Sequence, residues 1–164
     1  MNISRRSFIL LGILFWIVTI GTANAEPVKV PDLMLETAQG KLSLDKLQGQ
    51  VVYVDFWASW CGPCRKSFPW MNQMQQRYGN KGFKIVAVNV DSDQTLAKKF
   101  LTEHNANFTI AYDPQGKVAS AFKVKGMPNS YLIDRNGQIH SSHIGFREKD
   151  VAAMEAGIKA LIKQ

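Results

Sequence analysis

The chain alternates between apolar runs typical of buried strands and segments whose apolar residues recur with helical spacing. Near-continuous runs of β-branched and aromatic residues at 51–57 and 83–90 predict two strands buried on both faces. Helical spacing of apolar residues predicts helices at 65–78, 94–104 and 151–162. Weaker patterns predict the shorter elements: a hairpin of 32–36 and 41–44, a strand at 108–111, a helix at 117–122, and strands at 130–133 and 138–144.

The order of these elements predicts an α/β fold. Two strands come first, then three strands alternating with helices, then a hairpin and a closing helix. Such alternation is typical of a mostly parallel sheet with helices on both faces. The Asn136-Gly137 pair is a strong hairpin signal, and its hairpin adds an antiparallel edge. No internal repeat or low-complexity linker divides the chain, so we expect one domain.

The first 25 residues have the pattern of an export signal. Arg5-Arg6 precedes the apolar run 8–20, and Ala23-Asn24-Ala25 supplies a cleavage site of small residues. The run is about 20 Å long as a helix, short of the ~30 Å hydrocarbon core, although an uncleaved inner-membrane anchor stays an alternative. We therefore expect a signal peptide at 1–25 and a periplasmic domain at 26–164. The arginine pair also resembles a twin-arginine signal, so the export route stays open.

Composition and charge exclude several other classes of protein. The chain has 164 residues, of which 46% are hydrophobic and 20% charged, as in ordinary globular proteins. Its net charge of +7 comes from scattered residues without an aromatic-plus-basic motif, so we expect no nucleic-acid partner. Two cysteines cannot complete a four-thiolate zinc site. His140 and His143 are an odd number of residues apart on a predicted strand and point to opposite faces, so we expect no metal and no cofactor.

The cysteine pair Cys61-Gly62-Pro63-Cys64 lies between the strongest predicted strand and a helix. Pro63 is suited to a first helical turn, which places Cys61 at the helix N-terminus. Unpaired N–H groups and the helix dipole favour a thiolate there. We expect Cys61 to be reachable from solvent and Cys64 to lie behind it. A disulfide over so short a loop adds little stability, so a redox-active disulfide is the better interpretation than a structural one.

The segment 54–65, which contains this pair, resembles thioredoxin almost residue for residue. Met127-Pro128 resembles the cis-proline loop that this family places opposite its cysteines. The leading hairpin and the extra segment 91–122 resemble the exported TlpA-like branch, which includes the cytochrome-c-maturation thioredoxins. The resemblance implies a thioredoxin fold with a central mixed sheet, helices on both faces, an N-terminal β-hairpin and a central βα insertion.

The resemblance also implies roles for individual residues. Cys61 would be the attacking and departing thiol, Cys64 the resolving thiol, and Asp55 the buried carboxylate that takes a proton from Cys64. Substrate would bind along Trp60, Gly62, Pro63, Met127 and Pro128. Aromatic packing alone would also explain Trp60.

Two positions depart from the family pattern. Ser67 stands where cytochrome-maturation members commonly carry a glutamate, which counts against a dedicated role in haem-protein maturation. Ala87 stands at the position that matches the lysine paired with the buried aspartate of thioredoxin. The proton path from Asp55 is therefore expected to rely on water.

Together these features predict a monomeric thiol–disulfide oxidoreductase that reduces disulfides of exported proteins. The Gly-Pro dipeptide resembles that of reducing thioredoxins, so an electron donor is needed, which we expect to be a DsbD-like membrane reductase. A periplasmic oxidase or isomerase, and a non-enzymatic binding module or chaperone of thioredoxin fold, are the alternatives. A peroxiredoxin-type peroxidase is excluded, because Ala58 and Val54 stand where it needs Thr or Ser and Pro.

Overall fold

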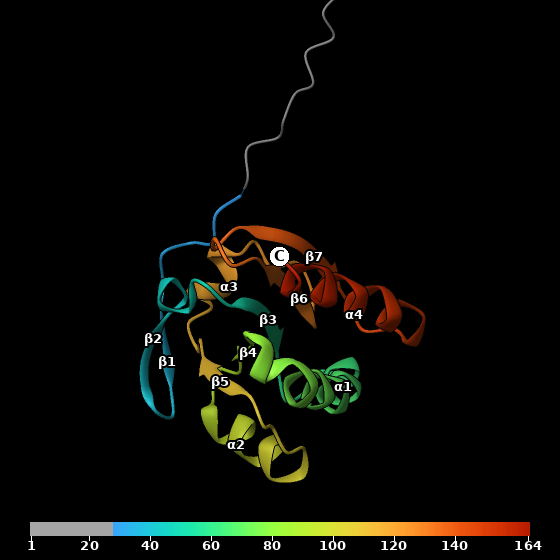
Figure 1. Ribbon diagram of the computed structural model, residues 1–164. Coiled ribbons are helices and arrows are strands. Elements are labelled where there is room, and N and C mark those ends of the chain that lie inside the picture. The colour runs from blue at the N-terminus through green and yellow to red at the C-terminus, as the bar shows by residue number, and fades with distance from the viewer. Residues whose placement is uncertain (1–27) are drawn as a thin grey trace, which may run out of the picture.

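The computed structural model describes residues 28–164, which form a seven-stranded sheet with helices packed on it (Figure 1). The strands are β1 (Met34–Thr37), β2 (Gly40–Ser43), β3 (Val51–Trp57), β4 (Phe83–Asn89), β5 (Thr109–Tyr112), β6 (Asn129–Ile133) and β7 (Ile139–Ile144). The helices are α1 (Gly62–Tyr78), α2 (Gln94–Glu103), α3 (Lys117–Ala121) and α4 (Glu148–Ile162), with 3₁₀ turns η1 (Leu44–Leu47) and η2 (Gly79–Lys81). The predicted signal peptide lies outside the described residues.

The strand order is β2-β1-β5-β4-β3-β6-β7, which confirms the mixed sheet of a thioredoxin fold. Parallel pairing is confined to β3 with β4 and β4 with β5. The other pairings, of β1 with β2 and β5 and of β6 with β3 and β7, are antiparallel. Fewer pairings are therefore parallel than the sequence predicted. The reason is that a hairpin lies on each side of the sheet, each joining antiparallel neighbours, and that the inner strands of these hairpins, β1 and β6, also run antiparallel to β5 and β3.

Both faces of the sheet are covered, which explains why β3 is buried along its whole length. On one face, Tyr53 and Trp57 pack in a cluster with buried residues of α1, α2 and α4. On the other, Val54 and Phe56 pack with residues of η1 and α3. Figure 1 shows α1 and α4 side by side, next to the end of β3. Because β3 is packed on both faces, the loop that follows it starts from a fixed position.

The element boundaries differ from the predicted ones mainly where a cap is involved. Helix α1 begins at Gly62 because Cys61 caps it, and α4 begins at Glu148, with acidic residues in its first turn. The segment before β1 pairs through Lys29 with Gln138, beside β7. Among the described residues, no helix is long and apolar enough to cross a membrane.

Candidate active site

The two cysteines form a disulfide at the N-terminus of α1. Cys61 is the N-cap residue, and its Sγ accepts a hydrogen bond from the backbone N of Cys64 at 3.2 Å. Pro63 occupies the first turn and has no N–H to donate. One backbone donor, that of Cys64, is therefore fixed on the sulfur of Cys61, at the positive end of a 17-residue helix.

The two sulfurs differ in position, but Cys61 is less open than the sequence predicted. Cys61 exposes 4% of its surface and Cys64 none. The capping hydrogen bond turns the Cys61 side chain back over the first turn of the helix, which explains its low exposure. Gly62 and Pro63 are exposed, and Trp60 exposes 67% of its surface. A partner would therefore approach Cys61 at the surface formed by these three residues.

The peptide bond between Met127 and Pro128 is cis. Pro128 is buried and directly precedes β6, which pairs antiparallel with β3. The last pair of that ladder joins Asn129 to Phe56, so Met127 and Pro128 lie beside the end of β3 that leads to Cys61. The Pro128 carbonyl accepts a hydrogen bond from Gly145 N at 2.7 Å, which ties this loop to the segment after β7. The structure thus brings the two motifs of the sequence to one end of the sheet.

Asp55 lies beneath this end, with 1% of its surface exposed. Its Oδ2 has no hydrogen-bond partner, and burial raises the pKa of the carboxyl well above its ordinary value. Its register partner on β4 is Ala87, which is the position predicted from the sequence to replace a lysine. Burial also raises the pKa of neighbouring Tyr53, with a further contribution from the charge of Asp55. No cation therefore offsets the cost of ionising Asp55 from β4.

Ser67 faces its own helix rather than the cysteines. It is buried, and its hydroxyl donates to the Cys64 carbonyl at 3.0 Å. This position supplies a local hydrogen bond and no carboxylate.

A second buried carboxylate, which the sequence analysis missed, holds the loop before the cysteines. Asp91 Oδ2 accepts from Ser59 N at 2.9 Å and from Asn89 Nδ2 at 2.8 Å, and its Oδ1 accepts from Ser59 Oγ at 3.1 Å. On the other side, Arg65 Nη2 donates to the Ser59 carbonyl at 3.1 Å. Ser59 is thus held between an anion and a cation, two residues before Cys61. The available signal was an acidic residue just after buried β4, since parallel strands end at the same edge.

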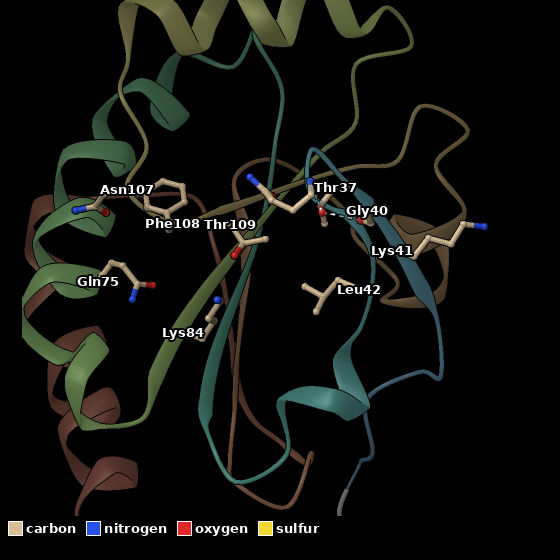
Figure 2. A pocket seen from close by; sticks show the side chains of 10 residues that line it. Thr37, Gly40, Lys41, Leu42, Gln75, Lys84, Asn107, Phe108 and Thr109 are labelled. Carbon is tan, nitrogen blue, oxygen red and sulfur yellow. Dashed lines mark hydrogen bonds between the residues drawn. The ribbon is translucent and has the colours of Figure 1, made fainter.

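One cavity among the described residues lies away from this site. It has a volume of about 390 Å³ and is lined from the β1–β2 turn, α1 and the first residues of β4 and β5 (Figure 2). Lys84 and Thr109 stand near the starts of their strands, whereas Cys61 follows the end of β3, so the cavity and the disulfide are at opposite ends of parallel strands. Gln75 lines it while accepting a hydrogen bond from Ile85 N at 2.8 Å. None of the site residues predicted from the sequence lines this cavity.

Comparisons with known proteins agree with the geometry. A family model described as Redoxin matches residues 25–161. The thiol-disulfide oxidoreductase ResA of Bacillus subtilis (strain 168) is 32% identical over 152 residues, covering 85% of each chain. ResA of Bacillus cereus (strain ZK / E33L) is 32% identical over 123 residues, covering 74% of this chain and 71% of the relative. A crystal structure from Chlorobium tepidum, assigned as thiol:disulfide interchange protein DsbE, has 52% identity and a TM-score of 0.81, covering 83% and 96% of the two chains.

Replacing Asp91 by Asn should loosen the loop that carries Ser59 and Cys61. An amide has only one oxygen to accept with, so hydrogen bonds to a charged group are lost, at a cost of about 1.5–3 kcal/mol each. We expect a lower free energy of unfolding in urea and slower disulfide exchange. The control is Asp93→Asn, which removes the same charge from the exposed N-cap of α2 and should change stability little, since Asn caps as well as Asp. Equal stability of both variants would contradict this role of Asp91.

Replacing Asp55 by Asn should stabilise the protein at neutral pH. The folded pKa of Asp55 lies above its unfolded value, so the native state binds more protons and its stability falls as pH rises above the ordinary carboxyl pKa. Urea unfolding between pH 4 and 8 should show a gain for the variant that grows with pH, on the order of 1–3 kcal/mol. Asp32→Asn, at an exposed position, serves as the control. A variant less stable than the wild type at pH 8 would show that the carboxylate is not destabilising.

Proposed function

Because this chain belongs to the Redoxin family and is a thiol–disulfide oxidoreductase, we propose that it works as a reductant of disulfides in exported proteins. The observation that carries the proposal is the Cys61–Cys64 pair capping α1. We place the mature protein in the periplasm as a monomer, with electrons supplied by a DsbD-like membrane reductase. The export pattern at the N-terminus supports this location.

The reaction is a two-step exchange. The Cys61 thiolate attacks one sulfur of the partner's disulfide, and the other partner sulfur leaves as a thiolate. The Cys64 thiol gives its proton to the Asp55 carboxylate and then attacks Cys61 Sγ, which breaks the mixed disulfide. Two electrons pass to the partner, both partner sulfurs end as thiols, and the Cys61–Cys64 disulfide forms. Asp55 suits this step because burial raises its pKa, so its carboxylate takes up a proton more readily than an ordinary carboxylate does.

The cap geometry supports the reducing direction. A thiolate at Cys61 is stabilised by each N–H that points at it, and stabilising the reduced form makes a disulfide more oxidising. Because Pro63 lacks an N–H, Cys64 N is the donor that the capping position retains. With few donors on Cys61, the disulfide form is favoured and the reduced protein gives up its electrons readily.

Partner binding is proposed on the surface beside Cys61. Trp60, Gly62 and Pro63 are exposed there, and a Cβ placed on Gly62 would meet nothing within 4 Å. Met127 and Pro128 would supply the opposite wall, where an extended partner segment can pair with backbone.

The reduction potential tests the direction of the reaction. Equilibration in glutathione buffers should give a low value, near the value of about −270 mV of thioredoxin. A value near the strong oxidants, at about −120 mV, would overturn the reducing role in favour of the oxidase alternative.

Partner trapping tests the roles of the two cysteines and the location. In cells that express the full chain, Cys64→Ser should accumulate mixed disulfides through Cys61, because the resolving thiol is missing. Cys61→Ser is the matched variant and should trap none and lose insulin reduction. Diagonal gels of the periplasmic and cytoplasmic fractions identify where the complexes lie. Trapping confined to cytoplasmic proteins would contradict the exported role.

A further inference from the structure

A row of side chains crosses the sheet from the buried Asp55 to the edge strand. Asp55 on β3 lies directly opposite Ser130 on β6, and Ser130 lies directly opposite His143 on β7. Residues directly opposite in antiparallel strands point to the same face, with Cβ atoms about 4.5–5.5 Å apart. On the other side of Asp55 the row continues to Ala87, which is apolar. The polar groups therefore lead from Asp55 in one direction, toward β7.

Both ends of this row carry buried polar atoms that lack a hydrogen bond. Asp55 Oδ2 has no partner, and neither has His143 Nε2. His143 Nε2 lies 3.3 Å from Asp150 Oδ2, without the geometry of a hydrogen bond, and the His143 side chain is 26% exposed. Buried polar groups without a protein partner are commonly bridged by ordered water.

A small cavity lies along the row. Its volume is about 50 Å³, and it is lined by Tyr53, Ser130 and His143 together with residues of α4. A water molecule occupies roughly 30 Å³ of liquid and needs two to four polar partners. Tyr53 and Ser130 both line this space, and the Ser130 hydroxyl donates to the His143 carbonyl at 3.5 Å. The cavity thus has the size and enough polar groups to hold water between Ser130 and His143, while Asp55 reaches this space only through its neighbour Ser130.

We propose that Ser130 and His143, bridged by water in this cavity, carry the proton between Asp55 and solvent. The proposal rests on the function proposed above and adds its proton path. During resolution the Cys64 proton moves to Asp55, then through Ser130 and water to His143 and out to solvent. When the disulfide is reduced again, a proton returns by the same path. No electron moves along this row.

The charges around His143 suit this task. Asp150 at the start of α4 stabilises the imidazolium while the proton is held there, and Arg147 hydrogen-bonds the same carboxylate. Lys149 also acts on Asp150 through its charge. An imidazole can take up and release protons at physiological pH, which a serine or an amide cannot. The relay therefore ends in a partly exposed group that exchanges protons with water.

The relay is tested by His143→Gln and Ser130→Ala. Stopped-flow tryptophan fluorescence follows oxidation of the reduced protein by a disulfide-bonded peptide across pH 5–9. Each variant should slow the resolution step about threefold to tenfold at pH 7, a fraction of the 10²–10⁴ that general acid–base catalysis contributes, and should flatten its pH profile. The reduction potential should not change, because a proton relay alters rates only. His140→Gln on the same strand, at an exposed position, is the matched control and should behave as wild type.

Two further variants separate the relay from structural damage. Ser130→Thr keeps the hydroxyl on a strand residue and should retain the wild-type rate. Ser130→Ala should add no further loss to Asp55→Asn, because it acts through Asp55, whereas independent effects would add. If Ser130→Ala and His143→Gln react at the wild-type rate while Asp55→Asn is slow, the relay is overturned and the proposed function stays intact. If the cysteine variants and the Asp55 variant all keep wild-type disulfide exchange, the proposed function itself is overturned.

Discussion

The hydrogen bond from Cys64 N to Cys61 Sγ is the contact on which the site depends. It makes Cys61 the cap of α1, and so it fixes where the helix begins, where the sulfur points and how strongly the helix stabilises a thiolate. Moving the start of the helix by one turn would remove the donor and take Cys64 away from Cys61. The rest of the site is arranged around this end: β3 delivers the loop, Asp91 holds it, and β6 brings Pro128 beside it.

The two buried carboxylates near this end differ in how they are hydrogen-bonded. Asp91 accepts three hydrogen bonds from Ser59 and Asn89, so its negative charge is satisfied and is used to hold a loop. Asp55 Oδ2 accepts none, and burial raises its pKa. A carboxylate left without a hydrogen-bond partner in an apolar setting binds a proton more readily. Asp91 therefore holds position, and the environment of Asp55 is the one that suits the proton transfer we propose, at some cost in stability.

Much of the fold followed from local pattern, because β3 and α1 carry strong signals. The run 51–57 was predicted with its observed limits, since a strand buried on both faces carries a near-continuous apolar run. The number of parallel pairings was overestimated, because alternation along the chain does not reveal that β6 and β1 enter the sheet antiparallel. The cysteine motif was found from its spacing and its place between a strong strand and a helix, and Pro128 by resemblance. Asp91 was missed, because its partner Ser59 is 32 residues away and only the parallel strand ends bring them together.

His143 shows how one sequence fact can carry two meanings. Its odd spacing from His140 was used to argue against a metal site, since the two side chains point to opposite faces. The register across β3, β6 and β7 places His143 on the face of Asp55, in line with Ser130, which the spacing of the two histidines could not show. Because Ala87 is apolar, the polar groups within reach of Asp55 lie toward β7. The apolar neighbour on β4 and the polar neighbours toward β7 thus belong to a single row of the sheet.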